Sequence, residues 1–92
     1  MNSEAAERLG ALALAWMAQD DELLGPFMAA SGADPTHLRA MAAEPEFLGF
    51  VLDFVLQEDS RVTRFAAFAD VRPEDVARAR ALLPGGDQPH WT

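Results

Sequence analysis

The segment EFLGFVLDFVLQ, residues 46–57, constrains the fold of this chain most strongly. Its apolar side chains fall on most sides of an α-helix, so a helix formed here must be covered by several neighbours. The apolar stretch 47–56 is only about half as long as a bilayer-spanning helix, and it contains Asp53. The sequence therefore predicts a buried central helix over residues 46–57, and no membrane partner.

Prolines and glycines divide the remainder into further segments whose apolar residues recur at helical spacing. In the first segment, Leu9, Leu12, Ala13 and Trp16 are predicted to face the core. The fold class we predict is all-α, a compact bundle of about six short helices in a single domain, residues 1–84, with a disordered tail over 85–92. The expected helices cover residues 3–18, 21–31, 35–44, 46–57, 60–69 and 73–83.

The two halves of the chain match each other weakly. A shift of 38 residues, the separation between Pro35 and Pro73, aligns helix-breaking residues with each other and apolar residues with each other, without a gap. This period predicts an internal repeat of two tandem three-helix modules, residues 9–46 and 47–84. The alternative is that any two alanine-rich helical hairpins with similar turns show such matches.

Composition narrows the partners that the chain can have. The net charge is −8, there is no cysteine, and every basic residue is an arginine. Phosphate backbones attract positive charge, so this balance argues against nucleic acid and anionic membranes. The N-terminal residues carry glutamates where a secretory signal carries lysine or arginine, so we expect a cytoplasmic protein.

No arrangement of side chains suggests catalysis. His37 and His90 are far apart, no serine lies in a nucleophile-elbow pattern, and no glycine-rich loop could cradle a phosphate. The acidic runs 20–22 and 58–59 lack the spacing of a cation loop and are predicted to cap helices. We therefore expect no enzyme, no catalytic or metal-binding residue and no cofactor.

Asp53 is an acid inside the apolar run, and a buried carboxylate there would be a functional candidate. However, Glu46, Gly49, Asp53 and Gln57 are three or four residues apart and so share one side of a helix. The simpler interpretation is a narrow solvent-facing strip.

A helix-turn-helix is the alternative functional hypothesis. Residues 21–31 and 35–44 are two helices joined by a tight turn, and the second could enter a DNA groove. That helix offers one arginine, Arg39, which is little for phosphate contacts.

The leading hypothesis is a non-enzymatic helical module that binds an unidentified protein or a second copy of itself. Pro26 is predicted either to kink the segment 21–31 or to delay its start. Either change could leave Trp16, Met17 or Met28 partly exposed, and methionine surfaces suit adaptable contacts. Arginines of the second half, Arg61 and Arg64 among them, form either a partner-binding patch or merely solubilising surface charge.

Several motifs together resemble a known bacterial family. These are Gly32-Ala33-Asp34-Pro35 with Leu38-Arg39, Phe47-Leu48, Val51-Leu52-Asp53-Phe54 and the closing stretch Ala79-Arg80-Ala81-Leu82-Leu83-Pro84. From about Glu7 to Pro84 the chain is similar to short, uncharacterised helical proteins, the domain of unknown function thirty-five seventy-two. This resemblance implies a bacterial cytoplasmic protein without an established activity, and it transfers no functional residues.

Overall fold

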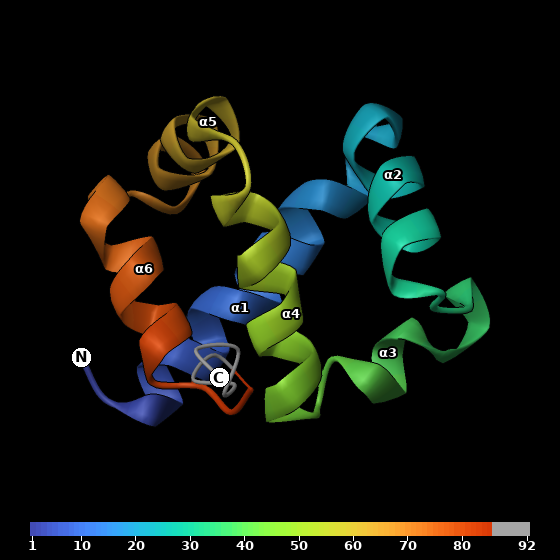
Figure 1. Ribbon diagram of the computed structural model, residues 1–92, viewed down its shortest axis with the longest axis horizontal. Coiled ribbons are helices and arrows are strands. Elements are labelled where there is room, and N and C mark those ends of the chain that lie inside the picture. The colour runs from blue at the N-terminus through green and yellow to red at the C-terminus, as the bar shows by residue number, and fades with distance from the viewer. Residues whose placement is uncertain (86–92) are drawn as a thin grey trace, which may run out of the picture.

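A computed structural model describes residues 1–85 of the chain, in which the regular elements are all helices, as predicted. The helices are arranged around α4, which crosses the middle of the molecule (Figure 1). In chain order the elements are α1 (Ser3–Ala18), α2 (Asp21–Ser31), the 3₁₀ turn η1 (Pro35–His37), α3 (Leu38–Met41), α4 (Pro45–Leu56), α5 (Asp59–Ala69) and α6 (Pro73–Ala81).

Helix α4 is the centre of the core, which confirms the prediction for residues 46–57. It packs against α1, α5 and α6, and its side chains Val51, Leu52 and Val55 are fully buried. Phe27 of α2 reaches the same helix, with its ring centroid 5.3 Å from that of Phe54. Burial on several sides at once is what an apolar circumference requires.

The crossing of α1 and α4 depends on Gly10. A β-carbon at this position would lie 2.9 Å from the β-carbon of Leu48, closer than side chains pack. Glycine therefore lets the two backbones approach and brings Ala6 and Ala13 of α1 into the core, where both are fully buried.

Helix α2 begins at Asp21 despite its internal proline, so the alternative of a late start is wrong. The Asp20 carboxylate accepts a hydrogen bond from the Glu22 backbone N–H at 2.9 Å, which confirms that this acid caps the helix. Gly25 and Pro26 are both exposed, so this part of the helix faces water. Gly32 ends the helix in the left-handed conformation, as expected.

The segment predicted as one helix over 35–44 is shorter and irregular. Only Leu38–Met41 is α-helical, after the turn η1. Glu44 is extended because it precedes Pro45. The chain leading to it forms two turns, in which the backbone N–H groups of Ala43 and Glu44 each donate to the carbonyl three residues back. The second acidic run also departs from expectation, because the Glu58 side chain makes no capping bond.

Within residues 1–85, no helix is both long and apolar enough to cross a membrane. The division into two three-helix modules stays a prediction; α3 has four residues and its proposed counterpart α6 has nine. Of the predicted tail, residues 86–92 lie outside the described residues.

Candidate functional site

The outward face of α1 is the most unusual surface of the molecule. Between Arg8 and Gln19 its exposed residues are all apolar. They recur three or four positions apart and therefore form one stripe along the helix. We call this set the α1 stripe: Ala11, Leu12, Ala15 and Ala18.

An apolar groove lies along each side of the α1 stripe. The first, of about 250 Å³, lies between α1 and the end of α5, where Leu9 and Leu12 face Ala69 and Val71. Met1, Ala5 and Arg8 complete its lining. Phe68, the residue before Ala69, is 44% exposed. The helix face and the end of α5 thus present a concave apolar surface with one cation.

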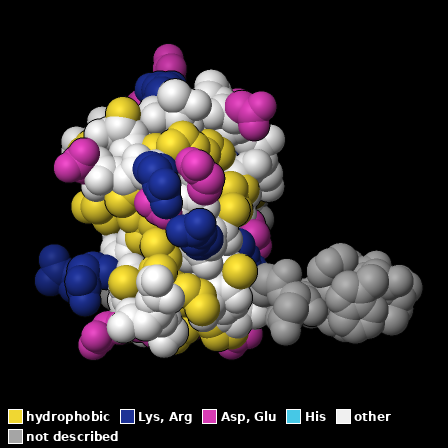
Figure 2. Space-filling model, turned by 90° about the vertical axis from the view of Figure 1, so that its left-hand side faces the viewer, with side chains coloured by type: hydrophobic (Ala, Val, Ile, Leu, Met, Phe, Trp, Pro, Cys, Tyr) yellow, Lys and Arg dark blue, Asp and Glu magenta, His cyan; other side chains and the backbone are white. Residues whose placement is uncertain are grey.

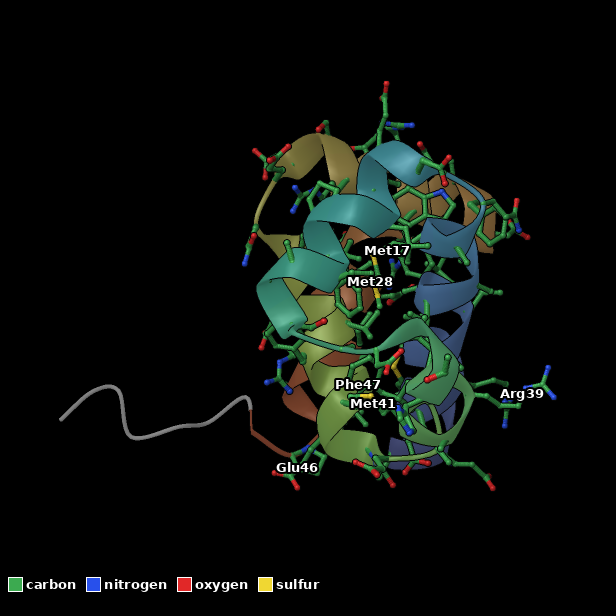
Figure 3. All side chains as sticks on the ribbon, turned by 90° about the vertical axis from the view of Figure 1, so that its right-hand side faces the viewer. Met17, Met28, Arg39, Met41, Glu46 and Phe47 are labelled. Carbon is green, nitrogen blue, oxygen red and sulfur yellow. The ribbon has the colours of Figure 1, made fainter. Side chains whose placement is uncertain are left out.

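The second groove, of about 430 Å³, lies between α1 and the α3 segment. Leu14, Ala15 and Ala18 of α1 form one wall. Leu38, Arg39 and Ala42 form the other. Arg39 extends outward beside α1, the blue helix (Figure 3). Each groove is therefore apolar and carries one arginine.

These two arginines differ from the other five in the chain. Arg61, Arg64, Arg72, Arg78 and Arg80 each form an ion pair with an aspartate or glutamate. Along residues 1–85, neither groove arginine lies within ion-pair distance of a carboxylate. On the face made by α5 and α6, by contrast, arginines and acids lie side by side over hydrophobic side chains (Figure 2).

Sequence reasoning did not find this surface. Leu12 was predicted to face the core, but it is 38% exposed, whereas Met17 and Leu14 are buried instead. The available signal was the run of alanines between Arg8 and Gln19, which leaves one side of the helix without a polar residue.

The predicted exposure near Pro26 is wrong for two of its three residues. Trp16 is buried against Phe65, with ring centroids 5.4 Å apart, and Met17 is completely enclosed. Met28 of α2 is half-buried and packs against the core cluster that contains Met17 (Figure 3). Because α2 remains helical through Pro26 and packs against α1, the expected exposure of Trp16 and Met17 does not arise.

Arg61 and Arg64, both predicted to lie on the outside, have different surroundings. The Arg61 side chain is only 14% exposed, donates to the Phe54 carbonyl at 2.8 Å and stacks on the Phe54 ring. Arg64 is exposed and lies 3.6 Å from the Asp20 carboxylate. The two have different partners, and a partner-binding role for either stays a prediction.

The predicted solvent-facing strip on α4 is also corrected. Glu46 and Gln57 at its ends are exposed, but Gly49 is buried and Asp53 is half-covered. Arg80, itself only 8% exposed, lies over this part of α4 and pairs with both oxygens of Asp53. Arg80 was expected on the surface; instead, it covers the middle of this strip.

Ionisable chemistry elsewhere in residues 1–85 is sparse. No group of three or more histidines, aspartates or glutamates is placed to hold a metal ion. The pKa of Asp34 is lowered, chiefly because its carboxylate accepts the backbone N–H of Thr36 at 3.0 Å. This bond closes the turn before α3 and leads to no cavity.

The fold and the surface define a small all-helical domain with an apolar groove on each side of the α1 stripe. The chain belongs to the family described as "Protein of unknown function (DUF3572)", whose model matches residues 3–86. No curated protein and no solved structure matches it.

Proposed function

We propose that this protein is a non-enzymatic interaction module that binds another protein through the α1 stripe and its two grooves. The observation that supports this is the continuous apolar face between Arg8 and Gln19, exposed on a helix whose opposite side is fully packed. Contiguous apolar surface costs solubility when it stays in water, and such surface marks interaction sites.

The small side chains of the stripe suit a helical partner. Alanines at Ala11, Ala15 and Ala18 allow a second helix to approach α1 closely, while Leu12 provides a knob that projects from the surface. A helix laid into a groove with anchors three to four residues apart is a recurrent mode of peptide recognition.

The DNA-binding alternative receives less support. Its second helix, α3, is one turn long, which is about 6 Å and too short to lie along a major groove. The net charge of −8 opposes binding to phosphates at long range. A cytoplasmic location is part of our proposal, because a cysteine-free chain fits a reducing compartment.

Partner capture with matched variants tests the proposal. Native lysate would be crosslinked with wild-type protein, with Leu12→Glu, and with Leu82→Glu as a control. Leu82 is 42% exposed, similar to Leu12, but it follows the end of α6 and lines neither groove. We expect a stoichiometric partner with wild type and Leu82→Glu, and its loss with Leu12→Glu. Equal capture by all three proteins, or no stoichiometric partner, would overturn the proposal.

A further inference from the structure

The charges beside the α1 stripe indicate what kind of helix it binds. From the missing ion pairs of Arg8 and Arg39, we infer that the partner is an amphipathic helix whose apolar side is flanked by two carboxylates, one for each arginine. The inference rests on the proposed function and specifies the chemistry of the partner.

The first step is that the two groove arginines, Arg8 and Arg39, form no ion pair within residues 1–85. This acidic chain has 15 carboxylates and seven arginines, and five of those arginines find a carboxylate within residues 1–85. Glu4 is one helical turn before Arg8, yet the two do not come within ion-pair distance. Arginine is among the residues enriched at protein interfaces, and it binds carboxylates through two parallel hydrogen bonds.

The second step is the separation of the two cations. Arg8 lies on α1 about two turns before Ala15, and Arg39 lies across the second groove from Ala15 and Ala18. Along α1 this places the arginines roughly 10–15 Å apart. A helix lying along the stripe would therefore meet them with carboxylates about seven to ten residues apart.

The third step concerns a second copy of the chain as the occupant. Paired in parallel, two α1 helices would bring Arg8 of one copy toward Arg8 of the other. In either orientation, two chains of charge −8 repel each other. The charge pattern thus favours a different, acidic-flanked helix.

Selection from a peptide library tests this chemistry directly. The probe is a displayed library of helical peptides with a fixed alanine–leucine stripe, in which two flanking positions seven to ten residues apart are Glu, Gln or Lys. Full-length protein is the target, and Leu12→Glu and Ala15→Glu, each checked for a wild-type circular dichroism spectrum, serve for counter-selection. We expect glutamate to exceed lysine about tenfold at both positions among binders.

Selected peptides would then be measured in solution by fluorescence anisotropy. Arg8→Gln and Arg39→Gln should each weaken binding about tenfold, whereas Arg78→Gln, an exposed arginine of α6 that pairs with Asp75, should leave it unchanged. The inference would be overturned if the selected peptides showed no preference among Glu, Gln and Lys, or preferred Lys. It would also be overturned if they bound the wild-type protein no better than the counter-selection variants. A wild-type dimer in sedimentation that Leu12→Glu dissociates would overturn it too.

Capture of the natural partner by these variants distinguishes a failure of this inference from a failure of the proposed function. If Leu12→Glu abolishes its capture while the double variant Arg8→Gln, Arg39→Gln retains it fully, the α1 stripe is the docking surface and the inferred carboxylates are wrong. If Leu12→Glu itself has no effect, the proposed function fails.

Discussion

The guanidinium group of Arg80 lies against the α-carbon of Gly49, in the space that a β-carbon would occupy. From there its Nη1 donates to the carbonyl of Pro84 at 3.1 Å and, less closely, to that of Leu83 at 3.4 Å. The other edge of the group pairs with Asp53, including a bond of 2.9 Å from Nη2 to Oδ2. One arginine of α6 thus joins α4 to the residues that follow α6.

Replacing Gly49 with alanine should destabilise the protein although alanine is the better helix former. The new methyl group would overlap Arg80 and lie 2.9 Å from the Pro84 carbonyl oxygen. Such overpacking costs about 1–3 kcal/mol, more than the propensity gain of about 1 kcal/mol. Urea denaturation of Gly49→Ala, Arg80→Ala and the double variant measures this. The cost of Gly49→Ala should shrink when Arg80 is absent; an unchanged cost would show that Arg80 is not the obstacle.

Lysine should be a poor substitute for Arg80. Its single ammonium group can reach either the carboxylate of Asp53 or the two backbone carbonyls, but it cannot reproduce the planar fork that binds both. We expect Arg80→Lys to lower the free energy of unfolding by about 2 kcal/mol, because partly buried acceptors lose their donor. Arg78→Lys, on the same helix but exposed, should stay within about 0.5 kcal/mol. Equal effects of the two substitutions would contradict this account.

The Arg80 contact shows where sequence periodicity stops being informative. Spacing placed Glu46, Gly49, Asp53 and Gln57 correctly on one side of α4, and the two ends of that strip do face solvent. The periodicity of one helix does not state what another helix brings to it. Because Arg80 is 27 residues from Asp53, their pairing depends on how α6 packs, which local patterns do not encode.

The same reasoning separates the parts of α1 that were predictable. An apolar repeat identifies a helix, but α1 has apolar residues on both sides, so the pattern did not decide which leucine points inward. Gly10 decides which leucine is buried, because it lets α4 pack closely against the side of α1 that carries Gly10. Leu9 is therefore buried and Leu12 stays at the surface. The candidate site was missed because it is defined only as the side of α1 that no helix within residues 1–85 covers.

Two phenylalanines of α4 should differ in their contribution to stability. Phe54 is buried, touches Phe27 and lies beneath the Arg61 guanidinium, whose central carbon is 3.9 Å from the ring centroid. Phe50 is only half-buried. Phe54→Ala should therefore cost about 3–5 kcal/mol and Phe50→Ala about 1.5–3 kcal/mol in chemical denaturation. The reverse order would mean that the packing around α4 differs from that described.

The turn before α3 should show an acid-sensitive contribution from Asp34. The pKa of Asp34 is lowered from its ordinary value of 3.8, chiefly by the Thr36 backbone N–H. A carboxyl whose folded pKa lies below its unfolded pKa stabilises the fold above the unfolded value, and this contribution is lost as pH falls through the folded value. Carboxyl NMR titration should give a midpoint below 3.8. A midpoint at or above 3.8 would show that the Thr36 backbone N–H does not stabilise the Asp34 carboxylate.

Replacing Pro26 with alanine should stabilise the protein. Proline within a helix lacks the N–H that would bond to the carbonyl of Glu22, and interior proline costs about 3 kcal/mol relative to alanine. Part of that gain is offset because alanine leaves the unfolded chain freer by about 0.4–1 kcal/mol, and water already reaches this exposed side of α2. We expect a net gain of about 1–2 kcal/mol, seen as a rise in Tm of roughly 4–16 °C for a domain of this size. Unchanged or reduced stability would show that Pro26 is needed to hold the neighbouring residue, Phe27, against Phe54 of α4.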